Sequence, residues 1–378
     1  MTDVVIAAYR RSPFHFAHKG ALTKLRPDEM TAQVVRALVE QTGLDPATIE
    51  DVIVGCAFPE GEQGLNVARL VSFLAGLPDS VAGATVNRFC GSSMQSVHQA
   101  AGAIRMGAGD AFLCAGVESM TRVPIMGFNP MPHPGLVQTF PQAYISMGET
   151  AENVAARHQV TRGDQEAFAT ESHRRAAAAQ AGGRLRDEIV PMVFNGTTVA
   201  EDGCIRAETT PESLSGLKPA FREGGTVTAG TSSPLTDGAA AVLVCTAQYA
   251  KDHGITPLAK VKSLAVSGCA PDVMGMGPVG AAQKALARAG LSARDIEVIE
   301  LNEAFASQAL ACMRELGLDQ AKVNRDGGAL ALGHPLGATG ARIVGKAAQV
   351  LQREGGRYAL ATQCIGGGQG IATVLEAL

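Results

Sequence analysis

The sequence lacks tryptophan altogether, and aromatic residues make up only 4% of its 378 positions. Hydrophobic residues of all kinds nevertheless account for 46%, and glycine occurs 44 times. Without bulky rings, a core must be filled by small and aliphatic side chains, which lets helices and strands approach closely. The composition therefore predicts a tightly packed α/β protein, long enough for two or three domains.

Other absences exclude whole classes of function. The formal net charge is −4 and there is no long basic run, which argues against nucleic acid as the main partner. No apolar run approaches the ~18–20 residues that a membrane span requires. The eight cysteines form no CxxC pair and no zinc spacing, so we expect no metal site and a reducing compartment. Because the chain begins with a strand-like Val4–Ala8 rather than a signal peptide, a cytoplasmic location is expected.

The order of strand-like and helix-like segments divides the chain into three parts. Residues 1–117 alternate strand and helix, which predicts a mostly parallel sheet covered by helices, and the buried strand within 236–257 rejoins it. Residues 118–235 form a large loop domain between these two segments. Residues 258–378 repeat the first unit, because the stretch 43–52 realigns without gaps on 290–299. A duplicated α/β unit is therefore expected.

One cysteine in the first unit stands at a position suited to chemistry. Cys90 follows a strand-like run and precedes a segment in which Met94, Val97, Ala101 and Ile104 have helical spacing. The start of a helix favours the thiolate form of a thiol, because unpaired N–H groups and the macrodipole stabilise negative charge. Taken alone, this stretch favours a buried structural cysteine, which is the commoner fate of a lone cysteine.

Three stretches of the second unit carry further reactive groups. Asn302 follows a strand, His334 stands in a glycine-lined turn before a helix, and Cys364 ends a strand ahead of Gly366 and its neighbouring glycines. Each has a plain alternative, such as a packed thiol or a simple turn. Together with Cys90, however, they would supply two thiols and an imidazole at one sheet edge, enough for acyl transfer and a proton transfer.

Five motifs in the same order resemble those of the thiolases, and the resemblance covers essentially the whole chain. They read NRFCGSSMQS, TVTAGTSSPLTDGAAAVL, NEAFASQ, GGALALGHPLGATGARI and CIGGGQGIA. The resemblance implies the thiolase fold: two duplicated α/β units with mixed sheets covered by helices, layered αβαβα, plus a large loop domain.

The resemblance also implies a role for each reactive group. Cys90 would be the acyl-accepting nucleophile and His334 the base that activates it. Cys364 would handle the α-proton of acetyl-CoA. Asn302 would hold a water that forms one oxyanion site together with His334, and the N–H groups of Cys90 and Gly366 would form the other.

Binding residues and partners follow from the same resemblance. The loop domain, residues 118–235, would build a groove for coenzyme A, which acts as a co-substrate, and would also make the oligomer contacts. No permanently bound cofactor and no metal are implied. The implied groove residues are Arg206, Ser213, Phe221, Ala229 and Ser233, with Met147 and Phe305 beside the acyl group. Arg206 and Ser213 are equally compatible with solvated loop residues. A homodimer or homotetramer is expected, and some fatty-acid-degrading members dock onto a multifunctional hydratase/dehydrogenase.

The choice of substrate rests on two local departures. Where the pattern of biosynthetic thiolases has Tyr-His-Met in this loop, this sequence has Ser146-Met147. The stretch Thr231–Pro234 is nearer to the pattern of the fatty-acid-degrading thiolases. We therefore expect a 3-ketoacyl-CoA thiolase of β-oxidation, with an acetoacetyl-CoA thiolase as the alternative. A non-catalytic CoA- or lipid-binding relative is disfavoured because both thiols and the imidazole are in place. Cys364 argues against a decarboxylating ketoacyl synthase. The duplicated α/β architecture argues against a papain-like hydrolase.

Overall fold

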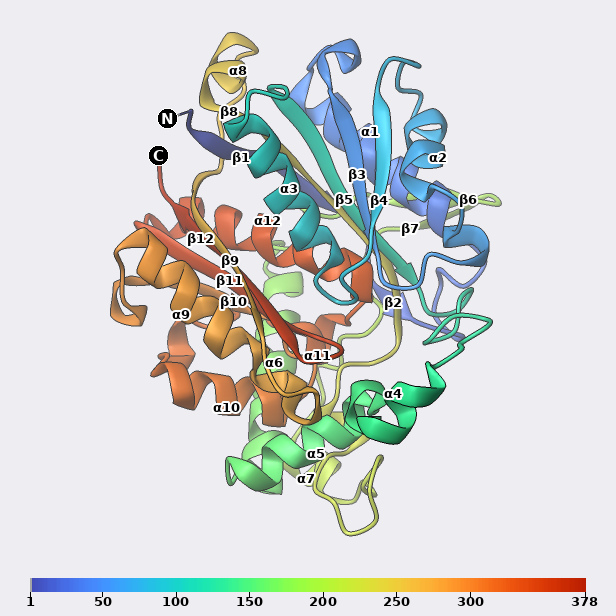
Figure 1. Cartoon of the computed structure of the whole chain (residues 1–378), viewed down its shortest axis with the longest axis vertical. Helices are drawn as coiled ribbons and strands as arrows, with labels where there is room; N and C mark the ends of the chain where they lie inside the picture. The colour runs from blue at the N-terminus through green and yellow to red at the C-terminus, as the bar shows by residue number, and fades with distance from the viewer. Residues whose placement is uncertain (1) are drawn as a thin grey trace.

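The main sheet runs through the whole molecule (Figure 1). The computed structural model describes residues 2–378, and its strands follow the order β10-β11-β12-β9-β1-β8-β5-β3-β4, with β2 paired to β8 off this path. Short strands β6 and β7 form a separate pair. The bounds are β1 Val4–Arg11, β2 His15–Phe16, β3 Asp51–Cys56, β4 Ala82–Val86, β5 Ala111–Ser119, β6 Met192–Phe194, β7 Thr197–Val199, β8 Thr236–Thr246, β9 Ala259–Gly268, β10 Val298–Leu301, β11 Tyr358–Ile365 and β12 Gln369–Glu376.

The two halves of this sheet have the same strand order. In the first half β4, β3 and β5 are parallel, and β8 and β1 follow antiparallel. In the second half β10 and β11 are parallel and β12 and β9 follow antiparallel, while Val323 makes a single parallel bridge to Ile299 where β4 would stand. The mixed sheets that the resemblance implies are thus present. No local pattern in the sequence indicated that they join edge to edge through β1 and β9, where Val5 pairs with Lys260.

Helices cover both outer faces and fill the space between the halves. The helices α1 and α2 pack on the first half, α9 and α10 on the second, and α3 and α12 lie between them. This arrangement gives the αβαβα layers. The bounds are α1 Pro27–Thr42, α2 Val67–Leu74, α3 Ser92–Arg105, α8 Ala247–Asp252, α9 Gly277–Ala289, α10 Ala306–Leu316, α11 Ala329–Leu332 and α12 Leu336–Glu354. In the described chain no helix is both long and apolar enough to span a membrane.

The segment between β5 and β8 contains the remaining helices. Of these, α5 and α6 pack against α10, so the segment is attached to the second half rather than projecting freely. Buried ion pairs attach it further: Arg11 bonds Glu188 and Asp202, and Lys346 of α12 bonds Glu188 and Asp326. The bounds are α4 Pro134–Thr139, α5 Met147–Arg157, α6 Arg162–Ala181 and α7 Pro211–Ser215.

Glycine allows the two central helices to approach their neighbours without side chains between them. A Cβ at Gly340 of α12 would lie 2.2 Å from the backbone nitrogen of Met94 on α3. One at Gly116 of β5 would lie 2.2 Å from the carbonyl oxygen of Gly337. The close approach of helices and strands in the central layer, which carries the reactive groups, therefore accounts for a composition rich in glycine and poor in aromatic rings.

This packing predicts opposite effects for two glycine substitutions on facing helices. Gly340→Ala should lower the free energy of unfolding by ~1–3 kcal/mol, because the added methyl meets the backbone of α3. Gly102→Ala is the matched control on α3: nothing lies within 4 Å of its Cβ position, so the helix should gain ~0.5–1 kcal/mol. Urea denaturation of both variants measures the difference, and equal stabilities would contradict the close α3–α12 contact.

Candidate active site

The predicted reactive residues lie at the carboxyl ends of strands and the starts of the central helices. Cys90 immediately precedes Gly91, the N-cap of α3, and His334 stands between α11 and α12. Asn302 follows β10, while Cys364 ends β11 and Gly366 begins the turn to β12. Ligands of parallel sheets bind at this edge because loops from several strands meet there. The first half thus contributes one thiol, and the second half contributes the other groups.

The second half pairs His334 with Asn302. The side-chain nitrogen of Asn302 lies 3.4 Å from His334 Nε2. On the other side of the ring, His334 Nδ1 lies 2.6 Å from the hydroxyl of Thr339, and that hydroxyl donates to the Pro335 carbonyl at 3.0 Å. Because the hydroxyl proton is committed, Thr339 accepts from Nδ1–H, which leaves the lone pair of Nε2 available. Thr339 therefore fixes the tautomer of a candidate base.

The amide of Asn302 carries an unpaired oxygen. Asn302 is fully buried, and its Oδ1 accepts no hydrogen bond from any residue between 2 and 378. A buried amide oxygen without a partner is costly, so this atom marks a place for a donor such as water. The predicted role of Asn302 as a water-holding residue stays a prediction, but its surroundings suit it.

Backbone N–H groups converge on the first thiol. Hydrogen bonds from the N–H of Gly366 and of Cys90 itself lower the pKa of the Cys90 thiol. Cys90 also lies close enough to Cys364 to raise the pKa of the Cys364 thiol, next to the larger effect of burial. The side-chain amide of Gln363 bonds the Cys90 carbonyl and holds the turn from the second half against the first. The two thiols and two N–H donors are therefore neighbours.

Burial sets the protonation of these groups. It raises the pKa of the partly exposed Cys90 thiol to about 12 despite the N–H donors, and the Glu118 carboxylate adds to the rise. The expectation of a resting thiolate at the helix start is therefore wrong, because desolvation outweighs the helix terminus. Burial also lowers the pKa of His334 to about 3, helped by the Arg342 guanidinium. Burial and the neighbouring Cys90 raise the pKa of Cys364 well above its ordinary value.

Two buried carboxylates hold the loops that carry these groups, and the sequence analysis singled out neither. Glu118 accepts from the backbone N–H of Ala57 at 2.8 Å and of Gly337 at 2.9 Å, so it connects the loop after β3 to the start of α12. Glu303 accepts from Asn324 and Ser172 at 2.7 and 2.6 Å. Their only sequence signal is an acidic residue at the end of an apolar strand.

The residues implied for substrate binding separate into two groups. Met147 and Phe305 pack with Cys364 in one apolar cluster, and the rings of Phe221 and Phe305 meet edge to face at 5.8 Å. Ser233 donates from its N–H to the Ala304 carbonyl at 3.0 Å, next to this cluster.

The remaining groove residues have other contacts. The Arg206 guanidinium lies 5.3 Å above the centre of the Phe16 ring, and its backbone N–H bonds His173. Ser213 is exposed and bonds Thr210 at the start of its own helix. Ala229 begins a single helical turn over residues 229–231, beside the packing of Gly230 on Leu214. Nothing in these contacts brings Arg206 to the apolar cluster.

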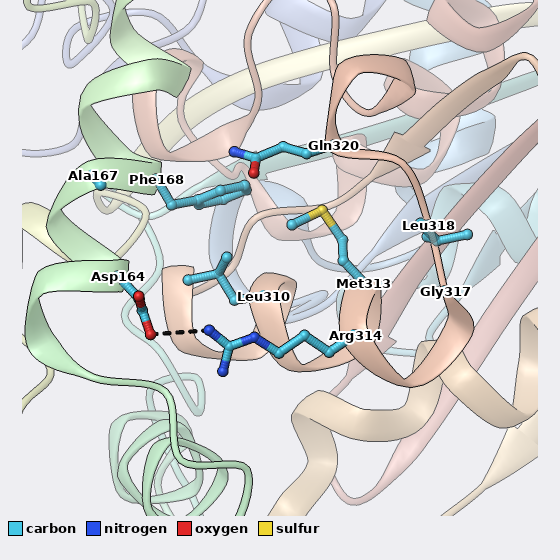
Figure 2. Close-up of a pocket in the computed structure, with 9 residues that line it drawn as sticks. All are labelled: Asp164, Ala167, Phe168, Leu310, Met313, Arg314, Gly317, Leu318 and Gln320. Atoms are coloured by element: carbon cyan, nitrogen blue, oxygen red, sulfur yellow. Dashed lines mark hydrogen bonds and ion pairs between the residues drawn. The ribbon is translucent and has the colours of Figure 1, made fainter.

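A cavity of about 460 Å³ lies away from this chemistry (Figure 2). It opens between α6 and α10, and the ion pair of Arg314 with Asp164, 2.9 Å long, stands on one side of it. Phe168 and Met313 contribute apolar lining. None of the predicted catalytic or binding residues lines this cavity, so it is not the candidate active site.

The tautomer and charge of His334 can be tested directly. With a pKa lowered to about 3, the imidazole should stay neutral with its proton on Nδ1 between about pH 5 and 8. Nitrogen-15 NMR of histidine-labelled protein measures both properties, with His334→Asn assigning the signal. Thr339→Val should mix the tautomers because Nδ1–H loses its acceptor, whereas Thr339→Ser should keep the wild-type spectrum. A His334 signal that titrates near pH 6.5 would contradict this structure.

Comparisons with known proteins agree along the whole chain. Two family models match: Thiolase, N-terminal domain, over residues 4–248, and Thiolase, C-terminal domain, over residues 255–377. The 3-ketoacyl-CoA thiolase of Bacillus subtilis (strain 168) is 46% identical over 389 residues, covering 100% of both chains. That of Pseudoalteromonas translucida (strain TAC 125) is 48% identical over 386 residues, covering 100% of this chain and 99% of the relative.

Solved structures confirm the predicted fold. The crystal structure of human mitochondrial 3-ketoacyl-CoA thiolase matches with a TM-score of 0.92 at 37% identity, covering 100% of this chain and 99% of that chain. The structure of the human mitochondrial enzyme in complex with CoA matches with the same TM-score of 0.92 and identity of 37%, covering 100% of this chain and 98% of the other.

Proposed function

The chain belongs to the thiolase family, and we propose on this premise that it is a 3-ketoacyl-CoA thiolase. It would cleave a 3-ketoacyl-CoA with coenzyme A to give acetyl-CoA and a shortened acyl-CoA. The observation that supports the proposal is that two pairs, His334 with Asn302 and Cys90 with Cys364, stand at the carboxyl ends of strands and the starts of the central helices. Formation of acetyl-CoA from a series of 3-ketoacyl-CoA substrates tests it, and cleavage of acetoacetyl-CoA alone would favour the acetoacetyl-CoA alternative.

The protonation states shape the first step. With a thiol pKa of about 12 and an imidazole pKa of about 3, the resting Cys90 is neutral and cannot hand its proton to His334 in advance. Proton transfer to Nε2 therefore accompanies the attack of sulfur on the 3-keto carbonyl. The alkoxide that forms would be stabilised by the N–H groups of Cys90 and Gly366, which already point at the sulfur.

The second step breaks the carbon–carbon bond. The electron pair of that bond moves into the acetyl-CoA unit, and negative charge develops on its thioester oxygen. Protonated His334 and a water on Asn302 would donate to this oxygen. Cys364 then gives its proton to the enolate carbon, a role that suits a thiol whose pKa is raised well above its ordinary value and which is therefore protonated.

The last step regenerates the enzyme. The thiol of coenzyme A gives its proton to the Cys364 thiolate, attacks the acyl group on Cys90 and releases the shortened acyl-CoA. His334 returns its proton to the departing Cys90 sulfur. The cycle is balanced without a metal or a redox cofactor, and coenzyme A is the only co-substrate required.

Assembly and location complete the proposal. We expect a homodimer or homotetramer, and β4 supports this because it is an edge strand bonded to β3 alone. The large apolar side chains of Phe73, Leu74 and Phe89 are exposed near it in sequence. A cytoplasmic location and docking with a hydratase/dehydrogenase rest on the family resemblance alone, as do the coenzyme A contacts of Arg206 and Ser213.

Substitution of each thiol should affect a different set of half-reactions. Cys364→Ala should block cleavage of the carbon–carbon bond, because no acid reaches the enolate, while Cys90 is still slowly acetylated by acetyl-CoA. Cys90→Ala should abolish both reactions. Radiolabelled acetyl transfer and steady-state thiolysis measure the two activities, and Cys312→Ala serves as a control thiol that is buried outside the proposed steps. Near wild-type thiolysis by Cys364→Ala would show that this residue is structural.

His334 should matter more than Asn302, although both face one oxyanion. Loss of a fixed donor typically costs ~10²–10³ in rate, and loss of the base should add about 10²–10⁴ for His334→Ala. Asn302→Ala should lose only the donor part, because solvent partly replaces the water it holds. Since both act on one oxygen, the double variant should lose less than the product of the single losses. Equal or strictly multiplicative losses in kcat on one 3-ketoacyl-CoA would refute a shared oxyanion site.

A further inference from the structure

The chain turns sharply immediately before the Cys90 sulfur. The N–H of Gly91 bonds the Arg88 carbonyl at 2.9 Å, so Phe89 and Cys90 are the two central residues of a tight turn. Phe89 has a φ of +42°, whereas the φ of Cys90 is not positive. A positive φ at the first central residue alone is the pattern of a type II′ turn, in which that position is normally glycine. The bulky side chain of Phe89 therefore makes this backbone strained.

Local hydrogen bonds hold the strained residue in place. The buried Ser92 hydroxyl donates to the Phe89 carbonyl at 2.6 Å and accepts from the Arg88 N–H at 2.9 Å. The Asn87 side chain accepts from the N–H of Phe89 at 2.8 Å. Both polar groups of the Phe89 backbone are thus bonded by side chains that flank the turn.

The second half of the molecule holds the same turn. The side-chain amide of Gln363 donates to the Cys90 carbonyl, and that of Gln369 accepts from the Arg88 guanidinium at 2.8 Å. Gln363 belongs to β11 and Gln369 to β12, so the two glutamines lie on either side of the turn that carries Gly366. Backbone strain persists only where the surrounding structure enforces it, and it is concentrated at functional sites. Here both halves enforce it, next to the candidate nucleophile.

Phe89 connects the two N–H donors that bond the Cys90 sulfur. Its backbone directly precedes the Cys90 N–H, which is one donor, and Gly366 supplies the other. Its ring lies 3.6 Å from the Cβ position of Gly366, and 5.9 Å separates its centre from that of the Phe58 ring. Because aromatic contacts of this kind are stabilising, they offset part of the strain that phenylalanine brings to a position suited to glycine.

We propose that Phe89 is a positioning residue for the oxyanion site at Cys90: its left-handed backbone directs the Cys90 N–H toward the reacting centre, and its ring supports the turn that carries Gly366. The inference rests on the proposed function and adds to it a residue that acts through two others. If φ at residue 89 returned to a negative value, the turn would open and the alkoxide would lose a fixed donor. The activity of variants should therefore follow the preference of residue 89 for a positive φ.

Three substitutions separate the backbone from the ring. Phe89→Gly, Phe89→Ala and Phe89→Val all remove the ring, together with any contact that it makes, but they differ in the backbone that they favour. Glycine adopts a positive φ freely, alanine at a cost, and β-branched valine hardly at all. We expect kcat to fall in the order Gly, Ala, Val, with Phe89→Val on the order of tenfold below Phe89→Gly at a similar KM. An effect of apolar contact alone would give the reverse order.

Stability gives a readout that needs no substrate. The apparent unfolding constant at a fixed urea concentration should rise in the same order, with Phe89→Gly about three- to tenfold below Phe89→Ala. Val193 on β6 is the matched control, because it is an exposed apolar residue on an extended strand. There valine should be the most stable of the three residues and glycine the least, and kcat should stay constant.

The hydrogen bond from the Phe89 N–H tests the same role with the ring intact. Asn87→Ala removes the acceptor of this bond and should lower kcat about three- to tenfold, because less then holds φ at its positive value. Asn87→Asp keeps an acceptor and should retain the wild-type kcat. Equal kcat values in the two Asn87 variants would contradict the positioning role.

The outcomes distinguish this inference from the proposed function. Active wild-type protein with equal kcat in the three Phe89 variants, or with the order Val, Ala, Gly, overturns the positioning role and leaves the thiolase function standing. Wild-type protein that cleaves no 3-ketoacyl-CoA overturns the proposed function and the inference together. If valine is more stabilising than glycine at residue 89, the turn is unstrained and the inference is wrong at any level of activity.

Discussion

The site depends on one buried carboxylate that joins the two halves of the molecule. Glu118 is 1% exposed at the end of β5 and accepts hydrogen bonds from the loop after β3 and from Gly337 at the start of α12. Without it, three backbone N–H groups would be buried without partners, and the start of α12 would lose one of its hydrogen bonds to the half that carries Cys90, while that of His334 to Thr236 would remain. The same carboxylate accepts from the N–H of Phe58 at 3.2 Å. Its negative charge also raises the pKa of Cys90, so the anchor opposes a resting thiolate.

A neutral resting site follows from this burial and has a chemical advantage. A permanent thiolate–imidazolium pair would be alkylated and oxidised readily, whereas a neutral thiol reacts only when a carbonyl is bound and His334 can take the proton. The N–H groups on the sulfur are better used for the alkoxide, where charge develops, than for a thiolate that is stabilised before reaction. Arg342, paired with Glu300 at 3.2 Å, lowers the pKa of His334 further and keeps the base unprotonated.

The sequence sufficed to predict the fold and to single out the candidate reactive residues, because both signals are local. Motifs around Cys90, His334 and Cys364 and the gapless repeat at 43–52 and 290–299 depend only on neighbours in the chain. Contacts between distant segments had no such signal. The β1–β9 junction and the role of Glu118 require the folded chain. The protonation of Cys90 was predicted in the wrong direction, because a helix start is visible in sequence and desolvation is not.

The proposed chemistry and the exposed apolar segment of residues 123–148 belong to parts with different physical character. The duplicated halves hold every residue that we propose to move a proton or an acyl unit, and close glycine contacts and buried charges fix them to one geometry. The segment from 123 to 148 lies outside this packing, without charge and largely exposed. Changes there cost little stability, because surface substitutions rarely disturb a core. Substitutions along this segment should consequently leave the two halves in place, because the hydrogen bonds of Glu118 between them involve no residue of the segment.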